Sequence, residues 1–220
     1  MKNKSVLFIV AILFFSFALN AQVQVSKEQR HKNVLENNYI RVLDVWLQPG
    51  DTSLFHIHST PSVFLIFTTT TTISQIKGGE WEKGKNDAGY SWYRSFFQDT
   101  LIHRVGNCDT IPFHVNDIEL LSAFNPNNKT TPLGFPLLYE NEKVLAYSFT
   151  KNSFNSENIS GRGPMIAELV SGDMVYYMDA VTNEKKEIKA GSYLYIDPGA
   201  SFYFIFKGKE KLNLVLFEIK

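Results

Sequence analysis

The chain has 220 residues, of which 44% are hydrophobic and 20% charged, which is typical of globular proteins and excludes the disordered class. The 22 Lys and Arg residues balance the 22 Asp and Glu residues, so no basic excess indicates a nucleic-acid partner. A single cysteine, Cys108, excludes a disulfide within the chain, and about 200 residues can bury a sufficient core without one.

The first 21 residues have the pattern of a secretory signal peptide. Lys2 and Lys4 precede an apolar run from Val6 to Leu19, and small or polar residues follow up to Ala21. The run is shorter than the ~20 residues of a membrane-spanning helix. We therefore expect cleavage after Ala21 rather than a retained anchor, and a mature protein that is periplasmic or secreted and not held by a membrane.

Residues 22–38 are polar and predict a loosely held arm or a short helix, in which His31 is expected to be a solvated surface histidine. Short runs rich in β-branched and aromatic residues follow and predict strands. They lie at 39–47, 53–59, 62–76, 92–97, 101–105 and 111–121. Residues 81–92, WEKGKNDAGYSW, hold two glycines, an asparagine and an aspartate, and predict a loop or hairpin tip.

The segment 125–136, NPNNKTTPLGFP, contains three prolines and three asparagines, and predicts a linker between an N-terminal unit, 22–124, and a C-terminal unit, 137–220. A second set of expected strands lies at 143–150, 165–170, 174–181, 185–190, 192–197, 201–208 and 211–219. Many short strands separated by turns predict an all-β sandwich or barrel.

The two units resemble each other weakly, which suggests an internal repeat. Pro61 and Pro164 each precede an apolar strand, and Glu119 and Glu218 each stand late in the last strand of their unit.

Two of the five histidines, His56 and His58, stand one residue apart after the turn signal Pro49-Gly50. Successive side chains in a strand alternate faces, so the two imidazoles point to one side, about 7 Å apart along the strand. That arrangement suits two ligands of one metal ion, and His103 in LIHRVGN is the candidate for a third.

These segments resemble the two motifs of the cupins. PGDTSLFHIH is similar to the first motif, in which five residues separate a glycine, here Gly50, from His-x-His. LIHRVGN is similar to the second motif, in which asparagine, here Asn107, follows a histidine by four residues. The resemblance implies double-stranded β-helix barrels, two units in tandem, and one divalent transition metal (Fe, Mn, Ni, Cu or Zn) held by His56, His58 and His103. Cupins often dimerise, so a homodimer is also implied.

The sequence departs from the cupin pattern in two places. The first motif usually continues to a glutamate ligand, but Ser62 and Val63 stand there. The C-terminal unit has no histidine: NISGRGP replaces the first motif, and Phe202 and Tyr203 stand about where the counterpart of His103 belongs. We therefore expect one metal site with three histidines, which leaves open coordination positions as catalytic sites do, and a C-terminal unit that supplies packing.

Two further residues have open roles. His114 is either a fourth ligand or, as we prefer, not a ligand. Arg94 shares a predicted strand face with Trp92 and Phe96, where it could clamp a substrate carboxylate. It could equally be an exposed charge or a core arginine, and we favour these plainer readings.

Two functions remain open at this stage. The first is an exported metal-dependent enzyme, such as a small-molecule dioxygenase or isomerase, by analogy of fold. The alternative is a non-enzymatic bicupin that binds a small sugar or acid or has a structural role. The geometry of the histidines distinguishes them: convergence with an open coordination position facing a cavity favours the enzyme, whereas divergence, or a side chain that caps the fourth position, favours the binding module. A third reading is a degenerate cupin whose histidines only pack.

Overall fold

The computed structural model describes residues 22–124, 130–151, 157–208 and 211–220. The predicted signal peptide and residues 125–129 of the predicted linker lie outside these ranges. Within them, no helix is long and apolar enough to span a membrane.

The described chain is almost entirely β-structure, which confirms the predicted fold class; a single 3-10 turn, η2, spans Val25–Lys27. The strands of the first half are β1 (Val23–Gln24), β2 (His31–Glu36), β3 (Ile40–Leu47), β4 (His56–His58), β5 (Ser62–Ile66), β6 (Thr70–Ile76), β7 (Trp81–Asn86), β8 (Ser91–Arg94), β9 (Leu101–Asn107) and β10 (Phe113–Leu120). Those of the second half are β11 (Leu137–Glu140), β12 (Val144–Thr150), β13 (Met165–Ser171), β14 (Val175–Asp179), β15 (Lys185–Ile188), β16 (Ser192–Ile196), β17 (Phe202–Phe206) and β18 (Asn213–Ile219).

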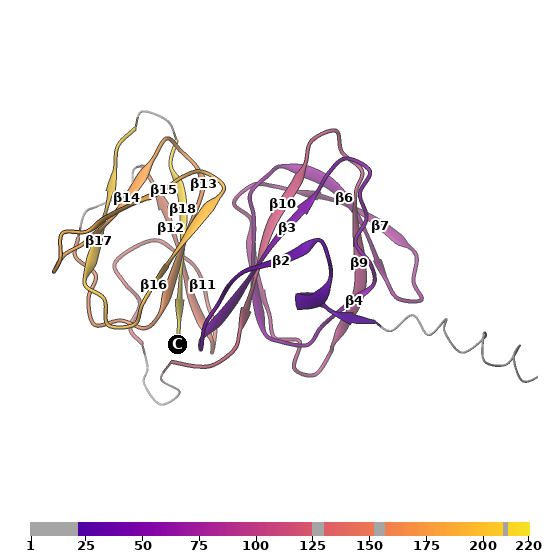
Figure 1. The fold of residues 1–220 in the computed structure, drawn as a ribbon, viewed down its shortest axis with the longest axis horizontal. Helices are drawn as coiled ribbons and strands as arrows, with labels where there is room; N and C mark the ends of the chain where they lie inside the picture. Colours follow the sequence, from indigo (N-terminus) through magenta and orange to yellow (C-terminus); the bar gives the residue numbers. More distant parts are fainter. Residues whose placement is uncertain (1–21, 125–129, 152–156, 209–210) are drawn as a thin grey trace, which may run out of the picture.

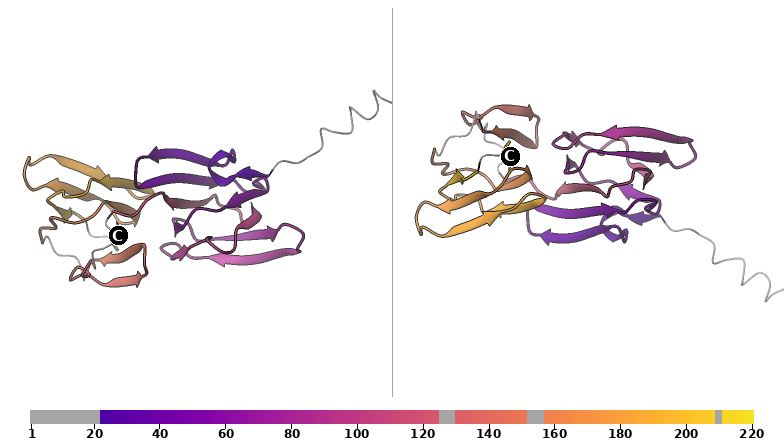
Figure 2. Two further views of the ribbon diagram at one scale, coloured as in Figure 1. Left: turned by 90° about the horizontal axis from the view of Figure 1, so that it is seen from below. Right: turned by 90° about the horizontal axis from the view of Figure 1, so that it is seen from above.

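The strands of the first half form two facing five-stranded sheets. One has the order β1-β4-β9-β6-β7 and the other β2-β3-β10-β5-β8. The second half repeats this plan with a five-stranded sheet, β11-β12-β18-β13-β16, and a three-stranded sheet, β15-β14-β17. Figure 1 shows the two halves as lobes side by side, and Figure 2 shows the layers within each lobe.

The two lobes meet through the outer faces of the sheet β2-β3-β10-β5-β8 in the first lobe and the five-stranded sheet in the second. One hydrophobic cluster joins residues of β3, β5 and β10 to residues of β12, β13 and β18, including Val63, Leu65 and Ile118 from one side and Ile166 and Phe217 from the other. These sheets are covered on both faces, so β5 and β10 are buried at every position. β5 (SVFLI) has the nearly continuous apolar run expected of such a strand, whereas β10 (FHVNDIEL) also buries polar side chains.

Strand register repeats between the halves. Ser62 pairs with Glu119 in one half, and Met165 pairs with Glu218 in the other. In each half the proline before the strand accepts the same backbone hydrogen bond, from Leu120 to Pro61 and from Ile219 to Pro164. An asparagine turn also precedes β3 in the first half and β12 in the second half. Asn37 and Asn141 accept backbone hydrogen bonds from the second and third residues that follow them.

One sequence expectation about the strands is wrong. Residues 81–92 contain β7 and the start of β8, with the turn confined to the residues between them. β7 is an edge strand that pairs only with β6, and nearly all of its residues are exposed. A solvated edge strand needs no apolar alternation, so its polar, glycine-containing sequence resembled a loop.

Candidate metal centre

Strand pairing brings the three predicted ligands together. β4 carries His56 and His58 and lies between β1 and β9. Antiparallel pairing with β9 places His56 directly opposite His103. The Nε2 atoms of His58 and His103 are 3.0 Å apart. Two ligand atoms at about 2.1 Å from one ion, at right angles, are separated by about that distance.

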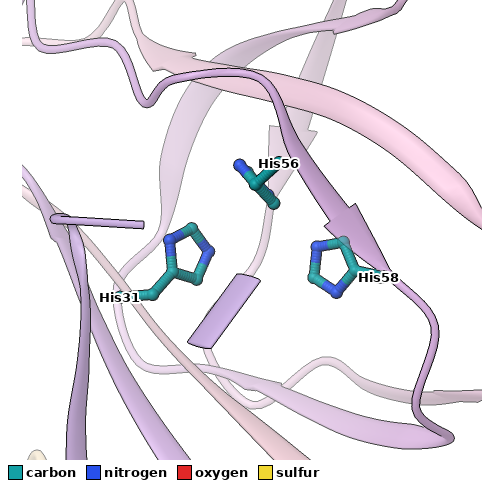
Figure 3. A group of neighbouring side chains, drawn as sticks. All are labelled: His31, His56 and His58. Atoms are coloured by element: carbon teal, nitrogen blue, oxygen red, sulfur yellow. The ribbon is translucent and has the colours of Figure 1, made fainter. Parts of the chain in front are cut away.

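A fourth histidine, His31, joins this group, and the expectation that it is solvated is wrong. Its side chain is only 8% exposed, and its ring centroid lies 4.5 Å from that of His56. The ligand atoms of His31, His56 and His58 all lie within 4.8 Å of one another. Figure 3 shows the three rings turned toward a common space, with His31 facing the two histidines of β4.

The N-terminal segment is therefore part of the site rather than a loose arm. β1 pairs in parallel with β4, so that Val23 lies beside His56. Val25 in the 3-10 turn is buried, and Glu28 just after it is only 2% exposed. β2 then begins at His31 and pairs with β3, placing His31 opposite Val45. The polar sequence of 22–38 gave no hydrophobic pattern that could have indicated this packing.

Hydrogen bonds fix the tautomers of two of the rings. The carbonyl oxygen of Leu54 can only accept, so His56 Nδ1 donates to it at 2.8 Å and Nε2 keeps its lone pair. His31 Nδ1 is 2.7 Å from Glu28 Oε2. Burial alone would raise the pKa of Glu28, but hydrogen bonds with His31 and with the backbone N–H groups of Leu54 and Arg30 lower it. The ionised carboxylate accepts from Nδ1, and the Nε2 of His31 is free to ligate.

His58 also has an acidic neighbour. Asp117 Oδ2 lies 3.4 Å from His58 Nδ1, but no hydrogen bond joins them. Asp117 is 1% exposed, and neither of its carboxylate oxygens has a hydrogen-bond partner among the described residues. Carboxylates and carbonyls behind ligating imidazoles orient the rings and raise their basicity. Glu28 and Leu54 stand in that relation to His31 and His56, whereas Asp117 lies beside His58 without a hydrogen bond to it.

Burial keeps two of the imidazoles, those of His56 and His103, neutral. It lowers the pKa of His56 to about 2, with smaller contributions from His31, His103 and His58. It lowers the pKa of His103 to about 3, with contributions from His58, His31 and Arg94. Neutral imidazole is the form that binds a metal. His56 Nε2 is also buried, with no hydrogen-bond partner in the part of the chain that the structure describes, and such an orphaned acceptor is costly unless something binds it. The donor set fits a divalent transition metal.

The histidines line a cavity of about 470 Å³ inside the first lobe. Its walls are mainly apolar, and polar groups from β6 and β7 line one side. The apolar lining residues are Val45, Leu47, Phe64, Ile76, Trp92, Leu101, Val105, Phe113 and Val115. This volume suits a small organic molecule beside the histidines.

A strained residue closes one side of the site. Phe96 has a φ of 52°, in the left-handed region that side chains other than glycine rarely adopt. The turn carries its ring inward, where it is 3% exposed and stacks on His58 with centroids 5.0 Å apart. Strained backbone of this kind is concentrated at functional sites.

The other residues singled out in the sequence have clear positions. His114 lies on the outer face of β10, where its Nε2 is 2.8 Å from Asp44 Oδ1 and its ring stacks between Trp46 and Phe67. It does not line the cavity, in agreement with the preferred non-ligand role. Asn107 donates to the carbonyl oxygens of Leu47 and Ile111 and so shapes the strand end.

Arg94 and Ser62, also singled out in the sequence, are both accounted for by their positions in the first lobe. Arg94 lines the cavity and its side chain is 40% exposed, so it is neither simply an exposed surface charge nor a core arginine. Ser62, where a glutamate ligand was absent from the motif, is buried and donates its hydroxyl hydrogen to the carbonyl oxygen of Thr60. It adds no metal ligand.

The register of the second lobe shows what replaces the histidines there. Ile159 pairs with Phe202 as His56 pairs with His103. Gly161 then corresponds to His58, because each stands three residues before its proline. Leu216 corresponds to Asp117, two residues before the repeated glutamate. Ile159, Phe202 and Leu216 belong to an apolar core cluster, so at these counterparts the second lobe is packed with hydrocarbon.

No protein-family model matches the sequence, and no curated protein does. Solved structures do. A cupin 2 conserved barrel domain protein from Leptotrichia buccalis is 10% identical, with a TM-score of 0.52 over 84% of this chain and 86% of that one. The chain has the cupin fold. A salicylate 1,2-dioxygenase from Pseudaminobacter salicylatoxidans is 10% identical, with a TM-score of 0.58 over 96% of this chain and 81% of that one.

A third similar structure is an oxalate decarboxylase from Lactobacillus farciminis in complex with formate. It is 12% identical, with a TM-score of 0.55 over 83% of this chain and 77% of that one. At such identities the likeness establishes the cupin fold, while the chemistry of this chain has to be argued from its own side chains.

Proposed function

We propose that this protein is an exported cupin that binds one divalent transition metal through His56, His58, His103 and His31 and acts on a small organic molecule in the adjoining cavity. The observation that carries the proposal is the convergence of four histidines on one cavity, with His56 Nε2 buried and unsatisfied. Export is supported by the signal-peptide pattern of the first 21 residues.

A bound divalent metal supplies Lewis acidity, and a redox-active one also supplies electrons. The protein's own groups hold the rings in place, keep His56 and His103 neutral and surround the site with apolar walls. Metal identity then matters for the reaction. Four imidazoles complete a tetrahedral sphere, which zinc prefers in structural sites, but leave positions open in the six-coordinate sphere common for iron, manganese and nickel.

His31 therefore supports a second candidate function. If the ion is tetrahedral, His31 closes the site, and the protein is a ligand-binding or structural cupin rather than an enzyme. Against this, the cavity remains lined by all four histidines and has room for a small molecule. The similar structures include a dioxygenase and a decarboxylase, so the fold itself does not choose among reactions.

Elemental analysis of residues 22–220, purified without a histidine tag, tests the proposal. We expect close to one Fe, Mn, Ni, Cu or Zn per wild-type chain and loss of that metal in His58→Ala. His114→Ala is the matched control, because it removes a buried histidine of the same lobe that lies outside the cavity. Wild-type protein that stays metal-free after reconstitution, or His58→Ala that keeps its metal, would contradict the proposal.

A further inference from the structure

The cavity carries one fixed positive charge. Arg94 is the only arginine or lysine among the described residues that line it. Its ion-pair partner, Asp99, is 87% exposed and 3.3 Å away. Exposed pairs of this kind contribute little, about 0–1 kcal/mol, so an incoming anion can replace Asp99 at low cost.

The guanidinium group is held close to the histidines by stacking. Its Cζ lies 5.0 Å from the ring centroid of Phe96, and that ring stacks on His58 at 5.0 Å. The ring of Phe96 therefore contacts both the Arg94 guanidinium and His58, a candidate metal ligand. A planar fork of donors in this position matches a carboxylate, which it can bind through two hydrogen bonds.

The remaining walls limit the kind of anion. Phe64 and Trp92 stack on each other with centroids 4.7 Å apart and an interplanar angle of 12°, and both contribute apolar surface to the cavity wall. Exposed Glu80 and Glu82 also line the cavity. These carboxylates repel a second negative charge on the ligand.

We propose that Arg94 makes this cavity a site for a small monocarboxylate with an apolar body, whose carboxylate pairs with the guanidinium while its body lies between the apolar walls and the histidines. This inference names the substrate class of the function proposed above and rests on it. Arg94 is a specificity residue in this scheme and ligates no metal.

Binding of 4-fluorobenzoate, followed by fluorine NMR, tests the inference in metal-reconstituted residues 22–220. We expect wild-type protein to bind it at least tenfold more tightly than the neutral 4-fluorobenzamide, and Arg94→Met to lose that preference. Arg104→Met is the matched control, because Arg104 also stacks on aromatic rings, those of Phe55 and Trp81, but does not line the cavity.

Metal content, measured on the same samples, separates this inference from the proposed function. Normal metal in Arg94→Met, together with lost preference for the anion, supports the inference. Normal metal with an unchanged preference overturns it and leaves the metal site standing. Wild-type protein without metal overturns the proposed function, and Arg94-dependent binding of 4-fluorobenzoate in that protein would still support the anion site.

Discussion

Replacing Glu168 with glutamine is expected to raise the free energy of unfolding at pH 7–8 by several kcal/mol. Glu168 on β13 is fully buried where the two lobes meet, and its Oε1 accepts a hydrogen bond from Asn116 Nδ2 of β10 at 2.5 Å. Its Oε2 has no hydrogen-bond partner among the described residues. Burial raises the pKa of Glu168 to about 8, against a smaller opposing effect of Asn116.

The direction of the pH dependence follows from proton binding. Between its ordinary pKa of 4.5 and about 8, the folded protein keeps the proton on Glu168 and the unfolded chain releases it. Stability therefore falls as pH rises through this window, by about 1.4 kcal/mol per pH unit, and levels off above it. At pH 7 the loss is on the order of 3 kcal/mol. Glutamine cannot ionise, and its amide oxygen can still accept from Asn116.

Urea unfolding of metal-free wild-type protein and Glu168→Gln between pH 6.5 and 8.5 measures this effect. The difference between the two proteins should widen with pH, and other titrating groups cancel in that difference. Glu82→Gln on the exposed edge strand β7 is the control and should stay within about 0.5 kcal/mol of wild type. Parallel curves for wild type and Glu168→Gln would show that the buried carboxyl does not hold a proton.

The all-β fold was predictable because the information was local. Turn signals and runs of β-branched residues located most of the strands, and two spaced histidine motifs predicted the cupin fold. The edge strand β7 was missed because it buries almost nothing, and β11, Leu137–Glu140, because it is short and largely exposed. Asn37 and Asn141, which cap equivalent turns, were a further signal of the repeat.

The candidate site was predictable only where sequence spacing fixes geometry. His56 and His58 share a strand face, and the second motif places His103 opposite them. His31 could not be found in this way, because it lies between charged and polar residues and reaches the site through long-range pairing of β1 with β4 and β2 with β3. Asp117 was equally hidden, since a lone aspartate in an apolar strand matches no motif.

The second prediction tests whether His31 belongs to the ligand set. Replacing His31 with alanine is expected to weaken Co²⁺ binding at least a hundredfold and to change the visible spectrum of the bound ion. The reason is the arrangement of its ring: Glu28 holds Nδ1 at 2.7 Å, and the ligand atom lies within 4.8 Å of those of His56 and His58. Losing a ligand changes the coordination of cobalt, and the visible bands report that change directly.

Glu28→Gln separates ligation from orientation. Glutamine keeps an acceptor for His31 Nδ1 but removes the charge, so we expect affinity to fall by about 10- to 100-fold, as for other groups behind metal ligands, with the cobalt spectrum retained. His114→Ala should change neither quantity, because that ring faces away from the cavity. If His31→Ala binds Co²⁺ with wild-type affinity and spectrum, the ligands are His56, His58 and His103 alone. The N-terminal segment then only covers a three-histidine site that has one more open position for a substrate.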